Sequence, residues 1–153
     1  PVEAATHIHF DAAPLRSAAT FANLVMFLGI HSKTIRERFS TNPRCRRLGH
    51  WPEELFDIVT AHDFSSLKWD QAKERIREVE LSKFCDFNLA NMVYEPHGKH
   101  TFEVRILPMW MEAPKIIEAA VYFAQILQWA QENDAKLRSS PSDISKVGTC
   151  NHK

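Results

Sequence analysis

Two short runs of alternating side chains, residues 6–10 and 101–107, constrain the fold of this chain most. Successive side chains of a strand point to opposite faces, so each run predicts a strand with one apolar face and one polar face. If both strands belong to one sheet, their polar positions lie close together. Those positions are His7, His9, Glu103 and Arg105.

These polar positions combine imidazole, carboxylate and guanidinium groups, a set that suits a metal-bound polyphosphate. Glu103 and a neutral histidine can ligate a divalent cation, and Arg105 can bind phosphate oxygens through two parallel hydrogen bonds. A Glu-x-Arg pair is equally typical of a solvated strand face, and a His-x-His motif by itself does not establish a metal site. The residues alone therefore leave a catalytic site and an ordinary exposed face as alternatives.

A further candidate is the polar loop of residues 40–49. Its three arginines, Arg44, Arg46 and Arg47, lie within four positions and can form an anion-binding patch. A solvated basic loop is the alternative interpretation of the same composition. The spacing does not say which arginine would contact a ligand.

The remaining chain predicts helices and one more strand. Helical spacing of apolar residues predicts a core helix over 15–30, a more exposed continuation to 38, a helix starting near 51, a surface helix over 69–83 and a last helix over 113–133. Residues 84–93 predict a strand next to the 101–107 strand, and a turn at 95–100 makes an antiparallel hairpin the expected connection.

This order of elements predicts an α+β fold, with an antiparallel sheet and helices packed on one face. A length of 153 residues suits one domain with a buried core. We assign residues 1–134 to that domain. Residues 135–153 are polar and rich in serine, so we expect a flexible tail there.

Composition excludes several classes of function. Lys plus Arg and Asp plus Glu both number 19, and the resulting net charge of zero argues against a nucleic-acid binder or a polybasic membrane surface. No apolar run reaches the ~20 residues that a membrane span needs. The 3 cysteines are too few and too far apart for a disulfide framework, so we expect a reducing, cytoplasmic location.

The order of motifs resembles that of carboxylate-amine ligases. His7-Ile8-His9, a helix, an arginine loop, Phe87-Asn88-Leu89 and Glu103-Val104-Arg105 before a closing helix are similar to the amidoligase family of the glutamine synthetase and γ-glutamylcysteine ligase superfamily. The resemblance covers residues 5–130 and implies the C-terminal part of the glutamine synthetase-like catalytic fold. Such ligases carry a Glu-x-Glu strand ahead of the His-x-His strand, so the resemblance implies a fragment whose N-terminal half is missing.

The resemblance implies an ATP-dependent ligase that joins a small-molecule or peptide carboxylate to an amine through an acyl phosphate, with ATP and Mg²⁺ as cofactors. The residues it implies are His7 and Glu103 as metal ligands, His9, Arg105, Arg44 and Arg47 for nucleotide or anionic substrate, and Arg105 with Glu103 as catalytic groups. Two alternatives stay open. One is a non-catalytic scaffold of the same fold, and the weaker one is a zinc hydrolase that uses both histidines and the glutamate.

Overall fold

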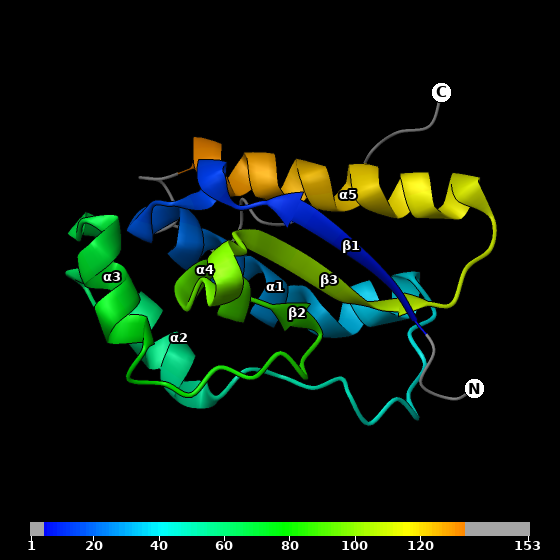
Figure 1. Ribbon diagram of the computed structural model, residues 1–153, viewed down its shortest axis with the longest axis horizontal. Helices are drawn as coiled ribbons and strands as arrows, with labels where there is room; N and C mark the ends of the chain where they lie inside the picture. The colour runs from blue at the N-terminus through cyan, green and yellow to red at the C-terminus, as the bar shows by residue number, and fades with distance from the viewer. Residues whose placement is uncertain (1–4, 134–153) are drawn as a thin grey trace.

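Three antiparallel strands in the order β1-β3-β2 form the sheet of the computed structural model, which describes residues 5–133 (Figure 1). β1 spans Ala5–Asp11, β2 spans Phe87–Asn88 and β3 spans Thr101–Pro108. β1 and β3 contain the two alternating runs, and they pair with each other. The predicted α+β class with an antiparallel sheet is confirmed.

Helices connect and cover the strands. The bounds are Ala18–Arg38 for α1, Glu53–Thr60 for α2, Trp69–Ile76 for α3, Ala90–Val93 for α4 and Ala113–Glu132 for α5, with short 3-10 helices η1 at Ala13–Leu15, η2 at Phe64–Ser66 and η3 at Pro96–Gly98. In Figure 1, α1 passes behind the sheet and α5 runs alongside β1. The last helix matches its sequence-based bounds to within one residue.

The apolar face of β3 lies in the core, as the alternation predicts. Phe102 stacks on Phe87 of β2 at a centroid distance of 6.2 Å, and Phe87 meets Phe123 of α5 at 5.8 Å. Val104 and Ile106 are buried in the same cluster. Because each large side chain that is fully buried contributes about 1.5–3 kcal/mol, this face contributes much of the stability of the sheet.

α1 is one continuous helix, where the sequence predicted a core helix ending at residue 30 and a separate continuation. Ser17 caps its N-terminus by accepting a hydrogen bond from the backbone of Thr20. Gly29 does not interrupt it, because the ring of Phe56 from α2 packs where a side chain would otherwise stand: a Cβ at position 29 would lie 2.4 Å from Phe56 Cε1. A tertiary contact therefore explains this glycine.

The strand predicted over residues 84–93 is mostly wrong, since β2 contains only Phe87 and Asn88. The side chain of Asn88 accepts a hydrogen bond from the backbone of Ala90 at 2.9 Å, and Leu89 already has helical dihedral angles, so the chain turns into α4. β2 does pair antiparallel with β3. The connection between them runs through α4 and η3 instead of a simple hairpin turn.

The surface helix predicted over residues 69–83 ends early, at Ile76. Beyond it, the hydroxyl of Tyr94 donates to the carbonyl of Val79 at 2.9 Å and accepts from the backbone of Leu81 at 3.1 Å. These bonds satisfy backbone groups that a longer helix would have paired internally.

The predicted tail over residues 135–153, and with it the domain boundary after 134, lies outside the described residues. Within residues 5–133, no helix is both long enough and apolar enough to cross a membrane.

Candidate functional site

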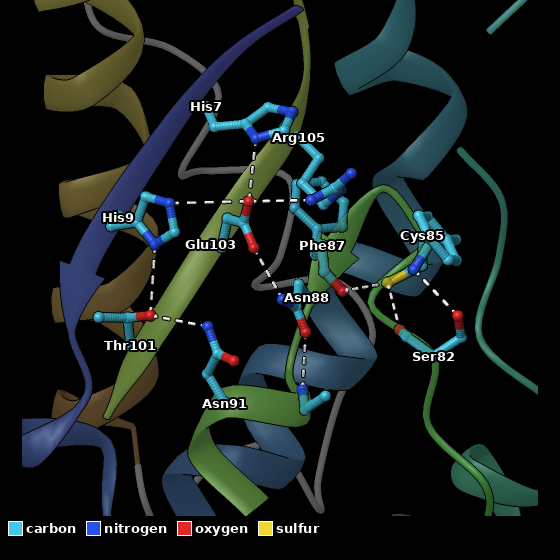
Figure 2. A network of polar contacts seen from close by, with 12 residues as sticks. His7, His9, Ser82, Cys85, Phe87, Asn88, Asn91, Thr101, Glu103 and Arg105 are labelled. Atoms are coloured by element: carbon cyan, nitrogen blue, oxygen red, sulfur yellow. Dashed lines mark hydrogen bonds and ion pairs between the residues drawn. The ribbon is translucent and has the colours of Figure 1, made fainter. Parts of the chain in front are cut away.

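A row of three polar side chains crosses the sheet on the face opposite the core. His9 of β1 and Asn88 of β2 are both paired with Glu103 of β3, one from each side. Directly opposed residues of an antiparallel pair project to the same face. The side chain of Glu103 is thus flanked by an imidazole and an amide, as Figure 2 shows.

Four side chains converge on the carboxylate of Glu103 (Figure 2). Its Oε1 lies 3.0 Å from Nδ1 of His7, 3.0 Å from Nη1 of Arg105 and 3.6 Å from Nε2 of His9. Its Oε2 accepts a hydrogen bond from Nδ2 of Asn88 at 2.7 Å. The structure therefore brings together the two predicted histidines, the glutamate and one predicted arginine, and adds Asn88. We call these five residues the Glu103 cluster.

A bulge in β3 lies beside this cluster. Thr6 pairs with Leu107 while Ile8 pairs with Val104, so two residues of β3 stand opposite His7. A bulge changes the direction of nearby side chains and increases the local twist of the strands. The strict alternation predicted for residues 101–107 ends at this bulge. His7 contacts Glu103 there, although the residue paired with Glu103 in the sheet is His9.

The solvated-face interpretation of Glu103 and Arg105 is wrong, because they are 5% and 9% exposed. Buried charges require partners, and these two supply each other. His7 and His9 keep side-chain exposures of 34% and 49%, so the cluster is reached from the histidine side. Nε of Arg105 is buried without a hydrogen-bond partner among residues 5–133.

The surroundings of His7 favour the neutral form of its ring. Burial lowers the pKa of His7 below its usual value, and the positive charge of Arg105 lowers it further, against the opposing effect of Glu103. With Nδ1 facing a carboxylate, the proton of the neutral ring belongs on Nδ1. Nε2 then carries a lone pair that can ligate a metal or accept a proton.

Glu103 is the one carboxylate of the cluster that could serve a metal ion. Mg²⁺ prefers oxygen and is commonly held by one or two carboxylates together with substrate phosphates and water. Glu103 supplies one carboxylate to such an ion. A zinc site needs three or four protein ligands, and the described part of the chain holds no group of three or more His, Cys, Asp or Glu side chains that could bind a metal. This arrangement does not favour the zinc hydrolase.

The predicted arginine loop is not part of the Glu103 cluster. Arg44 and Arg47 are exposed to solvent in the loop. The end of the loop is nevertheless tied to the strand residues beside the cluster. Gly49 and Asp86 exchange two hydrogen bonds, at 3.1 and 2.9 Å, and the carbonyl of Asp86 accepts from the backbone of Arg105 at 2.9 Å.

Asp86 is a structural residue that sequence reasoning missed. It is 4% exposed, and both of its carboxylate oxygens accept hydrogen bonds from Arg36 of α1, one of them at 2.7 Å. The sequence analysis placed residue 86 inside the predicted strand of residues 84–93 and gave no sign of a buried ion pair. Only the path of α1 behind the sheet brings Arg36 to it.

Asn88, Asn91 and Thr101 also received no role from the sequence. Alternation placed Asn88 opposite Phe87, but nothing in the sequence showed that Glu103 would be its neighbour. Asn91 of α4 donates to Oγ1 of Thr101 at 3.1 Å, and the same oxygen lies 3.3 Å from Nδ1 of His9. The contact of Thr101 with His9 joins residues 92 positions apart in the chain, so no local signal could have revealed it.

Comparison with known families gives one match. The model of a family described as "Putative amidoligase enzyme" matches residues 2–127, which include every residue of the Glu103 cluster. Neither a curated protein nor a solved structure matches the chain significantly.

Proposed function

Because this chain belongs to the amidoligase enzyme family, we propose that it forms an amide bond between a carboxylate and an amine with the use of ATP. The observation that carries the proposal is the buried carboxylate of Glu103, on which two histidines, an arginine and an asparagine converge. A buried carboxylate with so many polar neighbours is uncommon in a sheet that has only a structural role, because each polar group loses its hydration when it is buried.

The proposed chemistry has two steps. A carboxylate oxygen of the substrate attacks the γ-phosphorus of ATP, ADP leaves, and an acyl phosphate forms. The amine then attacks the acyl carbon, phosphate leaves with the electrons of the broken C–O bond, and the amine loses a proton. Both steps move negative charge between oxygens, so the protein contributes mainly by positioning and by electrostatic stabilisation.

Each residue of the cluster has a proposed part in this chemistry. Arg105 binds the transferred phosphoryl group through its guanidinium, which can form paired hydrogen bonds to phosphate oxygens. Glu103 and His7 are the groups that would hold magnesium, which neutralises phosphate charge when it is bound. His9 donates to the nucleotide. Its exposure places it on the open side of the cluster.

The loop arginines have a separate proposed part. Arg44 and Arg47 are exposed, and their loop is attached through Gly49 to Asp86, next to the backbone of Arg105. Either side chain would help to hold an anionic substrate or phosphate. The substrates would be a small-molecule or peptide carboxylate and an amine.

A nucleotide-binding experiment tests the proposal. Thermal unfolding is followed with ADP and Mg²⁺, with ATP and Mg²⁺, with Zn²⁺ alone and without additions. We expect stabilisation by the nucleotides in the presence of Mg²⁺. Arg105→Lys should weaken that binding at least tenfold, because lysine cannot make the paired contacts of a guanidinium. The matched control Arg38→Lys changes an exposed arginine of α1 and should bind as the parent does.

The reaction itself is tested with hydroxylamine in place of the amine. ATP-dependent formation of a hydroxamate from glutamate or glutamyl peptides would demonstrate an activated carboxylate. Stabilisation by Zn²⁺ alone would instead support the hydrolase. A chain that responds to neither nucleotide nor zinc would be a scaffold of the same fold, and either result overturns the proposed ligase.

A further inference from the structure

Two neighbouring histidines face the same oxygen through different ring nitrogens. His7 approaches Oε1 of Glu103 with Nδ1, and His9 approaches it with Nε2. A carboxylate oxygen only accepts hydrogen bonds, so a neutral imidazole facing it carries its proton on the facing nitrogen. The shared oxygen therefore favours opposite tautomers for the two rings.

Thr101 and Asn91 act on the far nitrogen of His9. Oγ1 of Thr101 lies 3.3 Å from Nδ1 of His9 and accepts a hydrogen bond from Nδ2 of Asn91 at 3.1 Å (Figure 2). The amide nitrogen can only donate, which leaves the hydroxyl hydrogen of Thr101 available for Nδ1. Hydrogen bonds then run from Asn91 to Thr101 and from Thr101 to His9, which leaves the proton of the neutral ring on Nε2, 3.6 Å from Oε1 of Glu103.

The reverse arrangement is electrostatically unfavourable. If His9 carried its proton on Nδ1, the lone pair of Nε2 would face the carboxylate oxygen of Glu103. His9 has a side-chain exposure of 49%, so packing alone does not fix its ring. The hydroxyl of Thr101, which lies in the same sheet two residue pairs closer to the end of β1, supplies a fixed partner.

We propose that Thr101 and Asn91 are positioning residues that hold His9 with its proton on Nε2, while His7 holds its proton on Nδ1. A nitrogen that carries a proton cannot ligate a cation, so the two histidines have different tasks. His7 presents the only imidazole lone pair of the cluster to a cation. His9 donates a hydrogen bond to an anionic oxygen, which under the proposed function belongs to a nucleotide phosphate.

The tautomers can be measured directly in the full chain without any ligand. Long-range ¹H–¹⁵N spectra at about pH 9, where a reference imidazole is neutral, distinguish protonated from unprotonated ring nitrogens. We expect His9 with a protonated Nε2 and an unprotonated Nδ1, and His7 with the reverse. Equal tautomers in the two rings, or a proton on Nδ1 of His9, would overturn the inference even before any variant is made.

Thr101→Val removes the hydroxyl and keeps the shape of the side chain. The spectra of His9 should then show loss of the single tautomer, and those of His7 should change little. Thr101→Ser should restore the parent spectrum. Thr34→Val, a matched change at an exposed position of α1, should leave both rings as they are. A His9 spectrum that stays the same in Thr101→Val would contradict the positioning role.

Nucleotide binding gives a second readout. We expect Thr101→Val to weaken ADP binding in the presence of Mg²⁺ about three- to tenfold, the usual range for one hydrogen bond, and Thr101→Ser to recover it. If the parent chain does not bind ADP, the proposed function fails while the tautomers still decide this inference. If it binds ADP and the tautomers differ from those expected, only the inference fails.

Discussion

Glu103 and Arg105 are two positions apart on β3 and form an ion pair, with Oε1 and Nη1 at 3.0 Å and with side-chain exposures of only 6% and 11%. Two charges with so little access to water depend on each other, because an unpaired charge at such a site loses its hydration without compensation. The pair therefore contributes to the stability of the sheet and also belongs to the candidate site.

Neutralising the glutamate should cost stability. Glu103→Gln leaves the guanidinium of Arg105 buried without its counter-charge, and removal of one partner of a buried pair typically costs about 3–5 kcal/mol. Urea unfolding should show that decrease in the free energy of unfolding. Glu118→Gln, at an exposed position of α5, should change it by less than about 0.5 kcal/mol. A loss at position 103 no larger than that of the control would contradict the buried pair.

Acid should destabilise the protein through His7. Since burial lowers the pKa of His7 in the folded state, the unfolded chain takes up a proton first as the pH falls below the reference value of 6.5. The contribution is fully present above pH 6.5 and is lost as the pH falls through the folded pKa. Burial lowers the pKa of His31 as well. In urea unfolding at a series of pH values, His7→Gln and His31→Gln should each flatten the decline. An unchanged slope in His7→Gln would contradict the assignment.

The pair of Asp86 and Arg36 should hold the arginine loop against the sheet. Asp86→Asn removes the charge that faces Arg36 and weakens the bond to the backbone of Gly49. We expect faster trypsin cleavage after Arg44, Arg46 and Arg47 under native conditions, measured by mass spectrometry, and a loss of about 3 kcal/mol in urea unfolding.

A matched control for this loop is Asp63→Asn, which breaks an ion pair with Arg75 near α3. It should leave loop cleavage at the rate of the parent chain. Equal acceleration by both variants would indicate general destabilisation in place of a local anchor.

Gly29 and Phe56 should be energetically coupled. Gly29→Ala places a methyl group 2.4 Å from the Phe56 ring. Such overpacking costs about 1–3 kcal/mol. This cost offsets the gain of about 1 kcal/mol in helix propensity that alanine brings over glycine. In a Phe56→Leu background the same change should stabilise α1. A double-mutant cycle from urea unfolding measures the coupling, and independent effects of the two changes would contradict the contact.

Local periodicity was sufficient for the two longer strands, β1 and β3, and for the last helix. The alternation of residues 6–10 and 101–107 set the two paired strands and placed His7, His9 and Glu103 on one side, because side-chain direction in a strand follows from its period of two. Likewise, the spacing of apolar residues and Pro114 near the start located α5. These features depend on neighbours within one turn or one pleat, so the sequence alone contains them.

The tertiary structure decided the features that depend on distant partners. Phe56 makes Gly29 compatible with a continuous α1, the bond of Asn88 to Ala90 ends β2 after two residues, and the bulge opposite His7 brings that ring to Glu103. The burial of Glu103 and Arg105 and the hydrogen bonds of Thr101 are of the same kind. Sequence periodicity reports which face a residue occupies, whereas the partner it meets on that face depends on strand register and helix packing, which only the folded chain determines.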